Sequence, residues 1–420
     1  MREIDARRLA WEVIFEVSFN QAFSNLLLPT KLRESKLSER DRNFATELTY
    51  GVLRMQGLVD GFIRRVADRA ISDIDPKTIV GLRIGTYQLK VLNTPPHAAI
   101  NETVELVKQT AGRSAGSFAN AVLRKISDLD TQSLDSWELH SHPKWIVNAF
   151  KDALRSDELV VEQLLADNKP AAPTLIAWPG RSTTAELTDC GAEPVRNSRY
   201  ALTFPGNPGE LLAVKERRAG VQDLGSQLVV ENFFDTGGNQ ELRWLDLCAG
   251  PGGKAAYLDS LLENGEFLAN EPNAERAKLV KQVVRKAKVT QFDGREIPSS
   301  IGTFDRILVD APCTGLGALR RRPEVRWRRK PEDLRGLVEL QAQLLDSAAA
   351  AINLNGVIGY ATCSPHLAET KFQIKDFLKR HANFERLAVS RFADGDGDMQ
   401  LWTYRDGTDS MYLSLLRRTA

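Results

Sequence analysis

Apolar residues recur at helical spacing through the first 130 residues or so of the chain. Residues 6–15 carry them on one face, and Ser38-Glu39-Arg40-Asp41 has the composition of a helix start that leads into a second such face over 43–52. Further helical patterns cover residues 76–92, 98–110 and 117–126. Because strand patterns are nearly absent here, the sequence predicts an all-α domain.

The pattern changes after a polar stretch at residues 128–141, which is followed by His142-Pro143 and predicts a domain boundary. From there to about residue 219, short strand-like runs at 173–178 and 200–204 are separated by helical segments. This texture is typical of a small mixed α/β module.

From about Arg243 onward, short apolar runs alternate with longer helical patterns. The expected strands and helices lie, in order, at 242–248, 255–262, 266–270, 274–286, 306–309, 332–354 and 357–362. The alternation predicts a Rossmann-like, doubly wound parallel sheet whose ligands bind beyond the carboxyl ends of the strands. We therefore expect three parts, at residues 1–132, 133–232 and 233–420.

Composition narrows the class of protein only in part. The 420 residues carry a net charge of +1, from 56 basic and 55 acidic side chains, which neither requires nor excludes a nucleic-acid partner. No secretory signal or membrane-spanning run is visible, and four cysteines without disulfide-like spacing fit a reducing compartment, so a cytoplasmic protein is expected. The absence of paired Cys-x-x-Cys or His-Glu-x-x-His motifs argues against a zinc site.

A glycine-rich loop, Leu-Asp-Leu-Cys-Ala-Gly-Pro-Gly-Gly-Lys at residues 245–254, follows a strand and opens a helix. The spacing excludes a phosphate-binding P-loop, because only two residues separate Gly250 from Gly253. A dinucleotide fingerprint stays open, since Ala255 is a permitted variant of its third glycine. Asp246, four residues before Gly250, gives an Asp-x-x-x-Gly-x-Gly pattern that resembles the first motif of S-adenosylmethionine-dependent methyltransferases.

This resemblance implies S-adenosylmethionine as cofactor. Glu271, at the end of the next strand, is expected to accept hydrogen bonds from both ribose hydroxyls. The alternative, a solvated residue at a strand end, is less favoured. Asp293 fits either a place beside the adenine or an ordinary turn aspartate. The expected cofactor contacts are Cys248, Ala249, Gly250, Pro251, Gly252, Gly253, Lys254, Glu271, Arg276, Asp293 and Asp310.

Two of the four cysteines directly follow apolar strand patterns, in Asp310-Ala-Pro-Cys313 and Thr362-Cys363-Ser-Pro365. An isolated cysteine is more often a small buried hydrophobe than a catalytic group. Thiols at neighbouring strand ends, however, can share one catalytic edge, one as nucleophile and the other as a group that releases the product. Residue chemistry alone permits either thiol to attack.

The residues around these cysteines resemble those of the RNA (cytosine-5) methyltransferase family over roughly residues 220–420. The corresponding motifs are the loop around Gly250, Asp310-Ala-Pro-Cys313, Arg322-Pro323-Glu324, Gln341, Thr362-Cys363-Ser364 and the Asp406-Gly-Thr-Asp409 segment, which resembles the family's closing hairpin. One departure concerns residues 366–370, His-Leu-Ala-Glu-Thr, where relatives often have a Glu-Glu-Asn-like stretch. The joint occurrence of spaced motifs is more specific than any one of them.

The resemblance implies a covalent mechanism. The Cys363 thiolate adds to carbon 6 of cytosine, and carbon 5 then attacks the methyl group of the cofactor. Asp310 holds the cytosine edge, and Cys313 assists loss of the carbon 5 proton and breakdown of the adduct. Lys254 is expected to contact the base or the cofactor, with a simple helix-start cation as the alternative.

DNA cytosine-5 methyltransferases suggest the reverse assignment, because their nucleophile is the Pro-Cys thiol, here Cys313. Those enzymes do not characteristically carry a second cysteine in a Thr-Cys context, so we favour Cys363. Cys248 is expected to contribute backbone rather than sulfur, and Cys190 has no catalytic context.

An arginine-rich segment, residues 320–330, follows the first cysteine motif closely. Its predicted RNA contacts are Arg320, Arg321, Arg322, Arg326 and Trp327, with a solvated basic loop as the alternative. Gln222, Asp223, Ser226 and Gln227 resemble the segment that introduces the family's catalytic domain and are expected to help to line the target pocket. A paired target base would have to be flipped out of its stack.

The helical region resembles the NusB-like RNA-binding domain in residues 47–54, 96–102 and 118–124. Within it, His97 is more readily explained by capping or packing than by catalysis. Together with the catalytic half, it resembles the bacterial RsmB/Sun/Fmu type, which implies methylation of a cytosine in small-subunit (16S) ribosomal RNA. The expected protein is a monomer with ribosomal RNA as partner and no membrane or metal.

Other functions stay open at this point. They are cytosine-5 methylation of another RNA such as tRNA, a noncatalytic RNA-binding factor that retains the fold, and a dinucleotide-dependent oxidoreductase. The intact thiols and glycine loop argue against the noncatalytic alternative.

Overall fold

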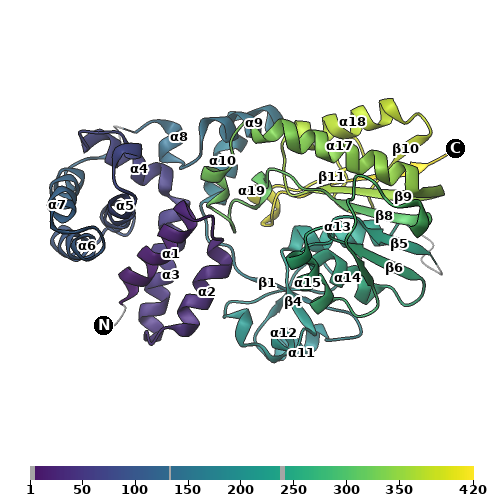
Figure 1. The fold of residues 1–420 in the computed structure, drawn as a ribbon, viewed down its shortest axis with the longest axis horizontal. Coiled ribbons are helices and arrows are strands. Elements are labelled where there is room, and N and C mark those ends of the chain that lie inside the picture. The colour runs from purple at the N-terminus through teal and green to yellow at the C-terminus, as the bar shows by residue number, and fades with distance from the viewer. Residues whose placement is uncertain (1–4, 132–133, 237–241) are drawn as a thin grey trace. The chain divides into compact units, whose positions relative to one another are not determined.

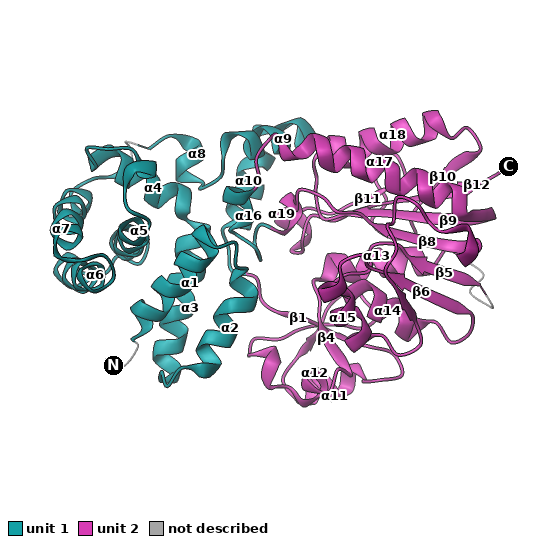
Figure 2. Ribbon diagram, in the orientation of Figure 1, with its two compact units in different colours: residues 1–170, 319–328 teal, residues 171–318, 329–420 magenta. Residues whose placement is uncertain are grey.

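The computed structural model describes residues 5–131, 134–236 and 242–420. The chain divides into two compact units (Figure 2), where three parts were expected. Unit 1 consists of residues 1–170 together with 319–328, and unit 2 of residues 171–318 together with 329–420. A segment between the two cysteine motifs thus belongs to the N-terminal unit.

Unit 1 is helical, as the apolar spacing predicts. Five helices coincide with the predicted patterns: α1 (Ala6–Phe19), α3 (Glu39–Arg54), α5 (Pro76–Lys90), α6 (Pro96–Ala111) and α7 (Arg113–Ser127). Ser38 caps α3, since its side chain accepts a hydrogen bond from the Asp41 amide. Two further helices, α2 (Ser24–Glu34) and α4 (Gln56–Val66), were not predicted.

The predicted boundary near residues 128–143 does not separate compact units. Three more helices, α8 (Ser136–Leu139), α9 (Lys144–Leu154) and α10 (Asp157–Asp167), continue unit 1 beyond it; residues 132–133 lie outside the described part. The last residue of the polar stretch, Ser141, is buried, and its hydroxyl donates to the Arg54 carbonyl at 2.9 Å and accepts from the Gly57 amide at 2.8 Å. His142 is fully buried.

Unit 2 begins with a small antiparallel sheet in the order β2-β3-β1-β4. Its strands are β1 (Thr174–Ala177), β2 (Glu193–Pro194), β3 (Ala201–Thr203) and β4 (Ala219–Val221), accompanied by α11 (Thr184–Asp189) and α12 (Leu212–Lys215). The predicted strands at 173–178 and 200–204 are confirmed as β1 and β3.

The large sheet of unit 2 has the order β10-β12-β9-β8-β5-β6-β7, with β11 paired to β12 (Figure 1). Its strands are β5 (Arg243–Asp246), β6 (Glu266–Asn270), β7 (Lys288–Thr290), β8 (Phe304–Asp310), β9 (Ile352–Thr362), β10 (Phe384–Leu387), β11 (Met399–Gln400) and β12 (Tyr412–Arg418). Strands β7, β6, β5, β8 and β9 are parallel, as predicted. The other edge is antiparallel, because β12 runs against β9 and β10 against β12.

Helices cover both faces of this sheet. One core contains residues of α13 (Leu224–Phe234), α14 (Gly253–Leu261) and α15 (Ala274–Val283), and the other contains residues of α17 (Asp333–Ala351) and α18 (Lys371–Arg380). The predicted boundary at residues 232/233 falls inside α13, and Leu228 and Trp244, which lie on either side of it, share the first core. Among the described residues, no helix is long and apolar enough to cross a membrane.

Candidate active site

The carboxyl ends of four parallel strands place polar side chains at one edge of the large sheet. Asp246 ends β5, Glu271 follows β6, Asp310 ends β8 and Cys363 follows β9. Since neighbouring parallel strands end at the same edge, the fold brings together groups that are far apart in sequence.

The glycine loop, Glu271 and Arg276 form one cluster, as the sequence predicts. The backbone of Gly250 approaches Glu271 so closely that a Cβ there would lie 2.0 Å from the carboxylate. Arg276 donates to the Gly250 carbonyl at 2.6 Å and pairs with Glu271 at 3.4 Å. Gly252, at the start of α14, has a backbone φ of +116°, which residues other than glycine rarely adopt.

Two buried polar groups beside this loop have free hydrogen-bonding atoms. Within the described residues, Asp246 Oδ2 and both amide atoms of Gln222 lack a partner. Gln222 lies against Gly253, since a Cβ on that glycine would stand 3.8 Å from its amide. Burial, and then the charge of Asp310, raise the pKa of Asp246 to about 8. These groups fit a ligand that carries a cation and further polar atoms.

Two expected cofactor residues have local roles in the structure. The Cys248 backbone amide donates to Asp246 Oδ1 at 3.3 Å, and burial raises the pKa of its thiol well above the ordinary value. Asp293 is exposed and forms a turn in which its Oδ1 accepts from the Arg295 amide at 3.0 Å. Its hydrogen bonds to Arg295 lower the pKa of Asp293 to about 2. The turn role of Asp293 is thus observed, and its place beside the adenine stays a prediction.

The two thiols predicted to cooperate lie in contact. Cys313 Sγ and Cys363 Sγ are 3.3 Å apart, on the loops that follow β8 and β9. The loops are tied by backbone hydrogen bonds, from the Ala311 amide to the Ala361 carbonyl and from the Gly317 amide to the Cys363 carbonyl, both at 2.9 Å. Gly317 must lack a side chain, because a Cβ would meet the Ser410 carbonyl oxygen at 2.2 Å.

The two thiols have different charged neighbours, since Lys254 interacts with Cys363 and Glu369 with Cys313. Lys254 Nζ donates to Asp310 Oδ2 at 2.8 Å. Burial works to lower the pKa of Lys254, but the charges of Asp310 and then Cys363 outweigh it and raise the pKa. The hydrogen bond to Cys363, burial and the charges of Cys363 and Glu369 all raise the pKa of the Cys313 thiol well above the ordinary value. Lys254 thus carries a positive charge that interacts with Cys363, whereas a thiolate is disfavoured at Cys313.

The segment expected to line the target pocket joins the one expected to close the domain. Asp223 Oδ1 accepts from the Thr408 hydroxyl at 2.6 Å and from the Asp409 amide at 3.0 Å. Residues 406–409 leave the short helix α19 (Thr403–Asp406) and lie in the connection between β11 and β12, which pair antiparallel as a hairpin does. Gln227 is fully buried, and its Nε2 donates to the Gln222 and Leu175 carbonyls, so its role is to hold this segment.

The prediction that Arg326 contacts RNA is wrong. Its side chain is fully buried inside unit 1, where the guanidinium donates to the carbonyls of Arg54, Ser141 and Asp167 and to Asn168 Oδ1, at 2.7 to 3.2 Å. Burial lowers its pKa to about 10. Trp327 is half-buried and its ring packs on Gly57 of α4. Both residues lie within the short helix α16 (Val325–Arg328), while Arg322 is exposed.

Sequence reasoning missed one residue of this site, Glu369. Its carboxylate is fully buried beside both thiol loops. From the sequence, residues 366–370 are only a departure from the family pattern, with no predicted role in the site. A charged residue six positions after the second cysteine carries no sign of burial in the sequence itself. Only the packing of α17 and β9 around it shows that it belongs to the site.

Comparisons with known proteins agree with this geometry. A family model described as 16S rRNA methyltransferase RsmB/F matches residues 237–417, and a NusB family model matches residues 4–128. A Mycobacterium tuberculosis protein, Rv1407, whose name describes a methyltransferase without a substrate, is 43% identical over 446 residues that cover 98% of this chain and 96% of its own.

Two further comparisons extend over the full chain. Ribosomal RNA small subunit methyltransferase B of Klebsiella pneumoniae is 30% identical over 437 residues, which cover 99% of each chain. The crystal structure of a protein called PH0851 superposes with a TM-score of 0.85 and 22% identity over 98% of each chain, a likeness that concerns the fold. With the helical unit, the doubly wound sheet and the paired thiols in place, the chain belongs to the RsmB/F family of RNA cytosine-5 methyltransferases, with an N-terminal NusB domain.

Proposed function

We propose that this protein transfers a methyl group from S-adenosylmethionine to carbon 5 of a cytosine in small-subunit (16S) ribosomal RNA. The observation that carries the proposal is the pair of thiols, 3.3 Å apart, beside the Lys254–Asp310 ion pair. The name of the Klebsiella pneumoniae relative supports the ribosomal substrate.

The free acceptors beside the glycine loop support the cofactor. Asp246 and Gln222 would hold the polar methionine end of S-adenosylmethionine, and Glu271 the ribose hydroxyls. When bound there, S-adenosylmethionine supplies an electrophilic methyl group. Arg276, which fixes both Glu271 and the Gly250 carbonyl, would keep the ribose acceptor in place.

Cys363 is the proposed nucleophile. Its thiolate, stabilised by the Lys254 ammonium, adds to carbon 6 of cytosine, and the electron pair of the carbon 5–carbon 6 bond moves toward the ring nitrogen and its carbonyl group. Asp310 holds the cytosine edge where that charge develops. Carbon 5 is then electron-rich enough to take the methyl group.

Cys313 is the proposed release group, and its surroundings suggest when it acts. The hydrogen bond to Cys363 is the largest cause that raises the pKa of the Cys313 thiol. That cause disappears once Cys363 sulfur is bonded to carbon 6, so the Cys313 thiol can lose its proton to solvent. The thiolate then removes the carbon 5 proton, the sulfur–carbon 6 bond breaks, and Cys363 leaves as a thiolate.

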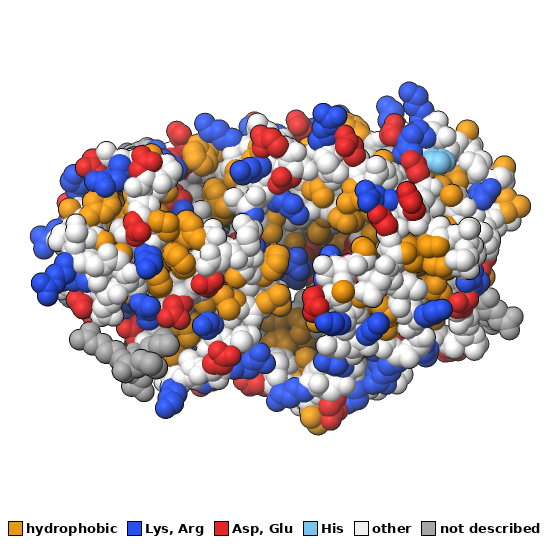
Figure 3. All heavy atoms as spheres, in the orientation of Figure 1, with side chains coloured by type: hydrophobic (Ala, Val, Ile, Leu, Met, Phe, Trp, Pro, Cys, Tyr) orange, Lys and Arg blue, Asp and Glu red, His pale blue; other side chains and the backbone are white. Residues whose placement is uncertain are grey.

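RNA contacts are proposed for both units. Arg320, Arg321 and Arg322 of unit 1 stay proposed contacts, whereas Arg326 is withdrawn. In unit 2, Figure 3 shows lysine and arginine side chains gathered over the area of α14, α15 and α12. Exposed basic residues of this area are Lys215, Arg217, Arg276, Lys278 and Lys281. Phosphate contacts of this kind make RNA affinity fall as salt rises.

Trapping experiments test the roles of the thiols. Cys363→Ala is expected to abolish methyl transfer and to form no covalent RNA complex, whereas Cys313→Ala is expected to transfer the methyl group and then stay bonded to the RNA. Denaturing electrophoresis of the protein–RNA mixture measures both. An adduct formed by Cys363→Ala but not by Cys313→Ala would reverse the assignment.

The RNA substrate has its own test. Bisulfite sequencing of cellular RNA, with and without the gene, is expected to show one 5-methylcytosine in small-subunit ribosomal RNA that depends on this protein. An unchanged ribosomal profile would refute the 16S substrate, and a lost site in tRNA would identify the other RNA.

A further inference from the structure

The carboxylate of Glu369 lies between the loops that carry the two thiols. Glu369 ends the short turn η6 (Leu367–Glu369) and is fully buried. It accepts hydrogen bonds from the Thr314 amide at 2.8 Å, the Ser364 hydroxyl at 2.6 Å and Gln341 Nε2 at 3.1 Å, and also from the Thr314 hydroxyl. One side chain thus contacts three separate elements.

These contacts are adjacent to the reacting groups. Thr314 follows Cys313 and Ser364 follows Cys363, so the carboxylate bridges the residues next to the two thiols. Gln341 of α17 also donates to the Pro312 carbonyl at 2.9 Å. The position of Glu369 is itself held, because the Tyr360 hydroxyl donates to its carbonyl at 2.9 Å.

Hydrogen bonds, rather than a cation, compensate this buried charge. Among the ion pairs of the described residues, none includes Glu369. A desolvated carboxylate without a counter-ion is costly unless its lone pairs are filled, and here donors from both loops and from α17 fill them. Separating the loops would leave the charge unsatisfied, so the carboxylate resists any change in their spacing.

We propose that Glu369 is a positioning residue for product release, holding the Cys313 loop against the Cys363 loop so that Cys313 reaches the adduct when it must be broken. The inference rests on the proposed function, since it concerns the second half of that reaction. Glu369 acts through the two loops and does not touch the substrate. The first half, attack by Cys363, depends on Lys254 and Asp310 and needs Glu369 less.

The test separates the two halves of the reaction in the full-length protein. Glu369→Ala is measured with a small-subunit ribosomal RNA fragment that the wild-type protein methylates. Methyl transfer in a single turnover is expected to change by about threefold at most, while multiple turnover falls by about 10- to 100-fold, as expected for a misplaced acid–base group. The covalent RNA complex then accumulates on denaturing gels. Glu369→Gln keeps one acceptor oxygen and is expected to recover part of the turnover.

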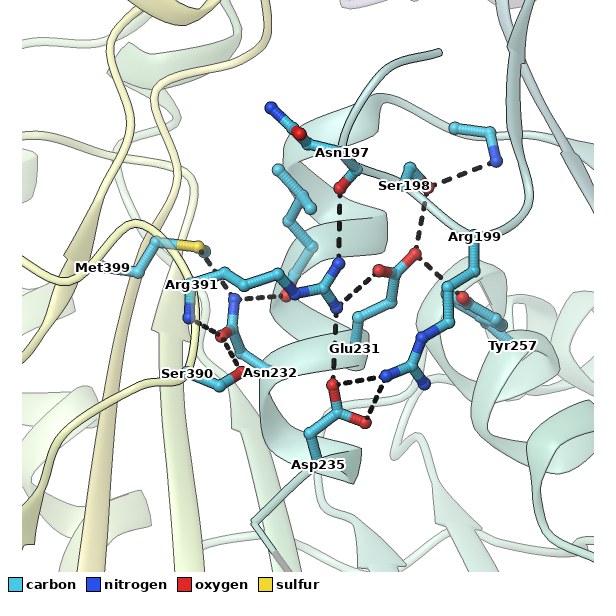
Figure 4. A network of polar contacts seen from close by, with 12 residues as sticks. Asn197, Ser198, Arg199, Glu231, Asn232, Asp235, Tyr257, Ser390, Arg391 and Met399 are labelled. Carbon is cyan, nitrogen blue, oxygen red and sulfur yellow. Dashed lines mark hydrogen bonds and ion pairs between the residues drawn. The ribbon is translucent and has the colours of Figure 1, made fainter. Parts of the chain in front are cut away.

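Glu231 offers a matched control in the same unit (Figure 4). Its carboxylate is also fully buried, accepts from the Ser198 and Tyr257 hydroxyls at 3.0 Å each, and pairs with Arg391 at 2.6 Å. Ser198, Tyr257 and Arg391 all lie outside the loops that carry the thiols. Glu231→Ala removes a comparable buried charge, and no RNA complex is expected to accumulate with it.

Three results would overturn the inference. The first is an equal loss of single and multiple turnover in Glu369→Ala without a trapped complex, which would make the residue merely structural. The second is accumulation of the complex in Glu231→Ala as well. The third is a wild-type protein that neither methylates RNA nor forms an adduct, which would refute the proposed function too. Should Glu369→Ala fail to fold by thermal melting, Ser364→Ala and Thr314→Val each remove one contact, and each is expected to accumulate some complex.

Discussion

Asp246 shows at the scale of one residue how burial creates a ligand site. Its Oδ2 has no partner among the described residues, and burial together with Asp310 raises its pKa to about 8. The group therefore binds a proton at neutral pH that it gives up once a cation approaches. The Asp-x-x-x-Gly-x-Gly spacing predicts that this residue matters, but its protonation follows only from the packing around it.

A proton is expected to leave the protein when the cofactor binds. Near pH 7, Asp246 with a pKa of about 8 is mostly protonated, and a cationic ligand group lowers that pKa, so up to about one proton is released per cofactor. Release declines as pH rises through 8, because the carboxyl is then already ionised. Isothermal calorimetry in buffers of different ionisation enthalpy measures it. Asp246→Asn is expected to bind without this release, and an unchanged release would assign the proton elsewhere.

Arg326 marks the limit of prediction from residue type. A run of basic residues after Cys313 is typical of RNA contacts, and Arg322 fits that interpretation since it is exposed. Four positions later, the same residue type is fully buried on backbone carbonyls. The sequence pattern is the same for both, because an arginine that satisfies buried acceptors and one that binds phosphate differ only in what surrounds them.

At the scale of elements, the segment at residues 319–328 is built into unit 1. Besides Arg326, Glu324 accepts from the Ser24 hydroxyl at 2.9 Å, and Arg328 donates to the Val17 carbonyl at 2.7 Å. These contacts reach α2, the end of α1 and the α9–α10 region. A ten-residue segment that is flanked on both sides by unit 2 thus supplies hydrogen bonds to buried groups of the helical unit.

Removing the Arg326 guanidinium is expected to destabilise unit 1. Arg326→Leu leaves buried carbonyls without donors, at a cost of about 3 kcal/mol or more in the free energy of unfolding. Arg322→Leu, which alters an exposed residue of the same segment, is expected to change it by less than about 0.5 kcal/mol. Urea unfolding followed by circular dichroism compares them, and equal stability of the two variants would contradict the buried role.

Periodicity predicted elements better than it predicted their pairing. The strand predicted at 266–270 and the helix predicted from 274 are observed as β6 and α15. Such elements can be predicted because the spacing of apolar residues within one segment reflects its own secondary structure. The antiparallel edge formed by β12 was not predicted, since residues 412–416 are all buried and such a run looks the same in either direction. Strand direction depends on where the chain re-enters the sheet.

At the scale of the whole molecule, each unit has its own core. One pair of hydrophobic clusters lies in the helices of unit 1, and the clusters around the two sheets lie in unit 2. Every residue proposed for cofactor binding and thiol chemistry belongs to unit 2. The chain crosses between the units after residues 170, 318 and 328.

Unit 2 is expected to fold and bind the cofactor without unit 1. The variant consists of residues 171–420 with 319–328 replaced by ten glycine and serine residues, which leaves no orphaned arginine. Its affinity for S-adenosylmethionine is expected to stay within about threefold of the full chain, whereas its RNA affinity falls about tenfold or more because the phosphate contacts of unit 1 are lost. Calorimetry and filter binding measure the two. Loss of cofactor binding in a folded variant would contradict this division.

The sequence by itself determined the helical N-terminal domain, the order of strands and helices that makes a doubly wound sheet, and the loops that carry Asp246, Cys313 and Cys363. These follow from local periodicity and from motifs whose residues are close in sequence. Only the tertiary structure decided the 3.3 Å contact of the thiols, the burial of Arg326 and the position of Glu369 between the thiol loops. Contacts between distant segments depend on packing and desolvation, and the spacing of residues along the chain predicts neither of them.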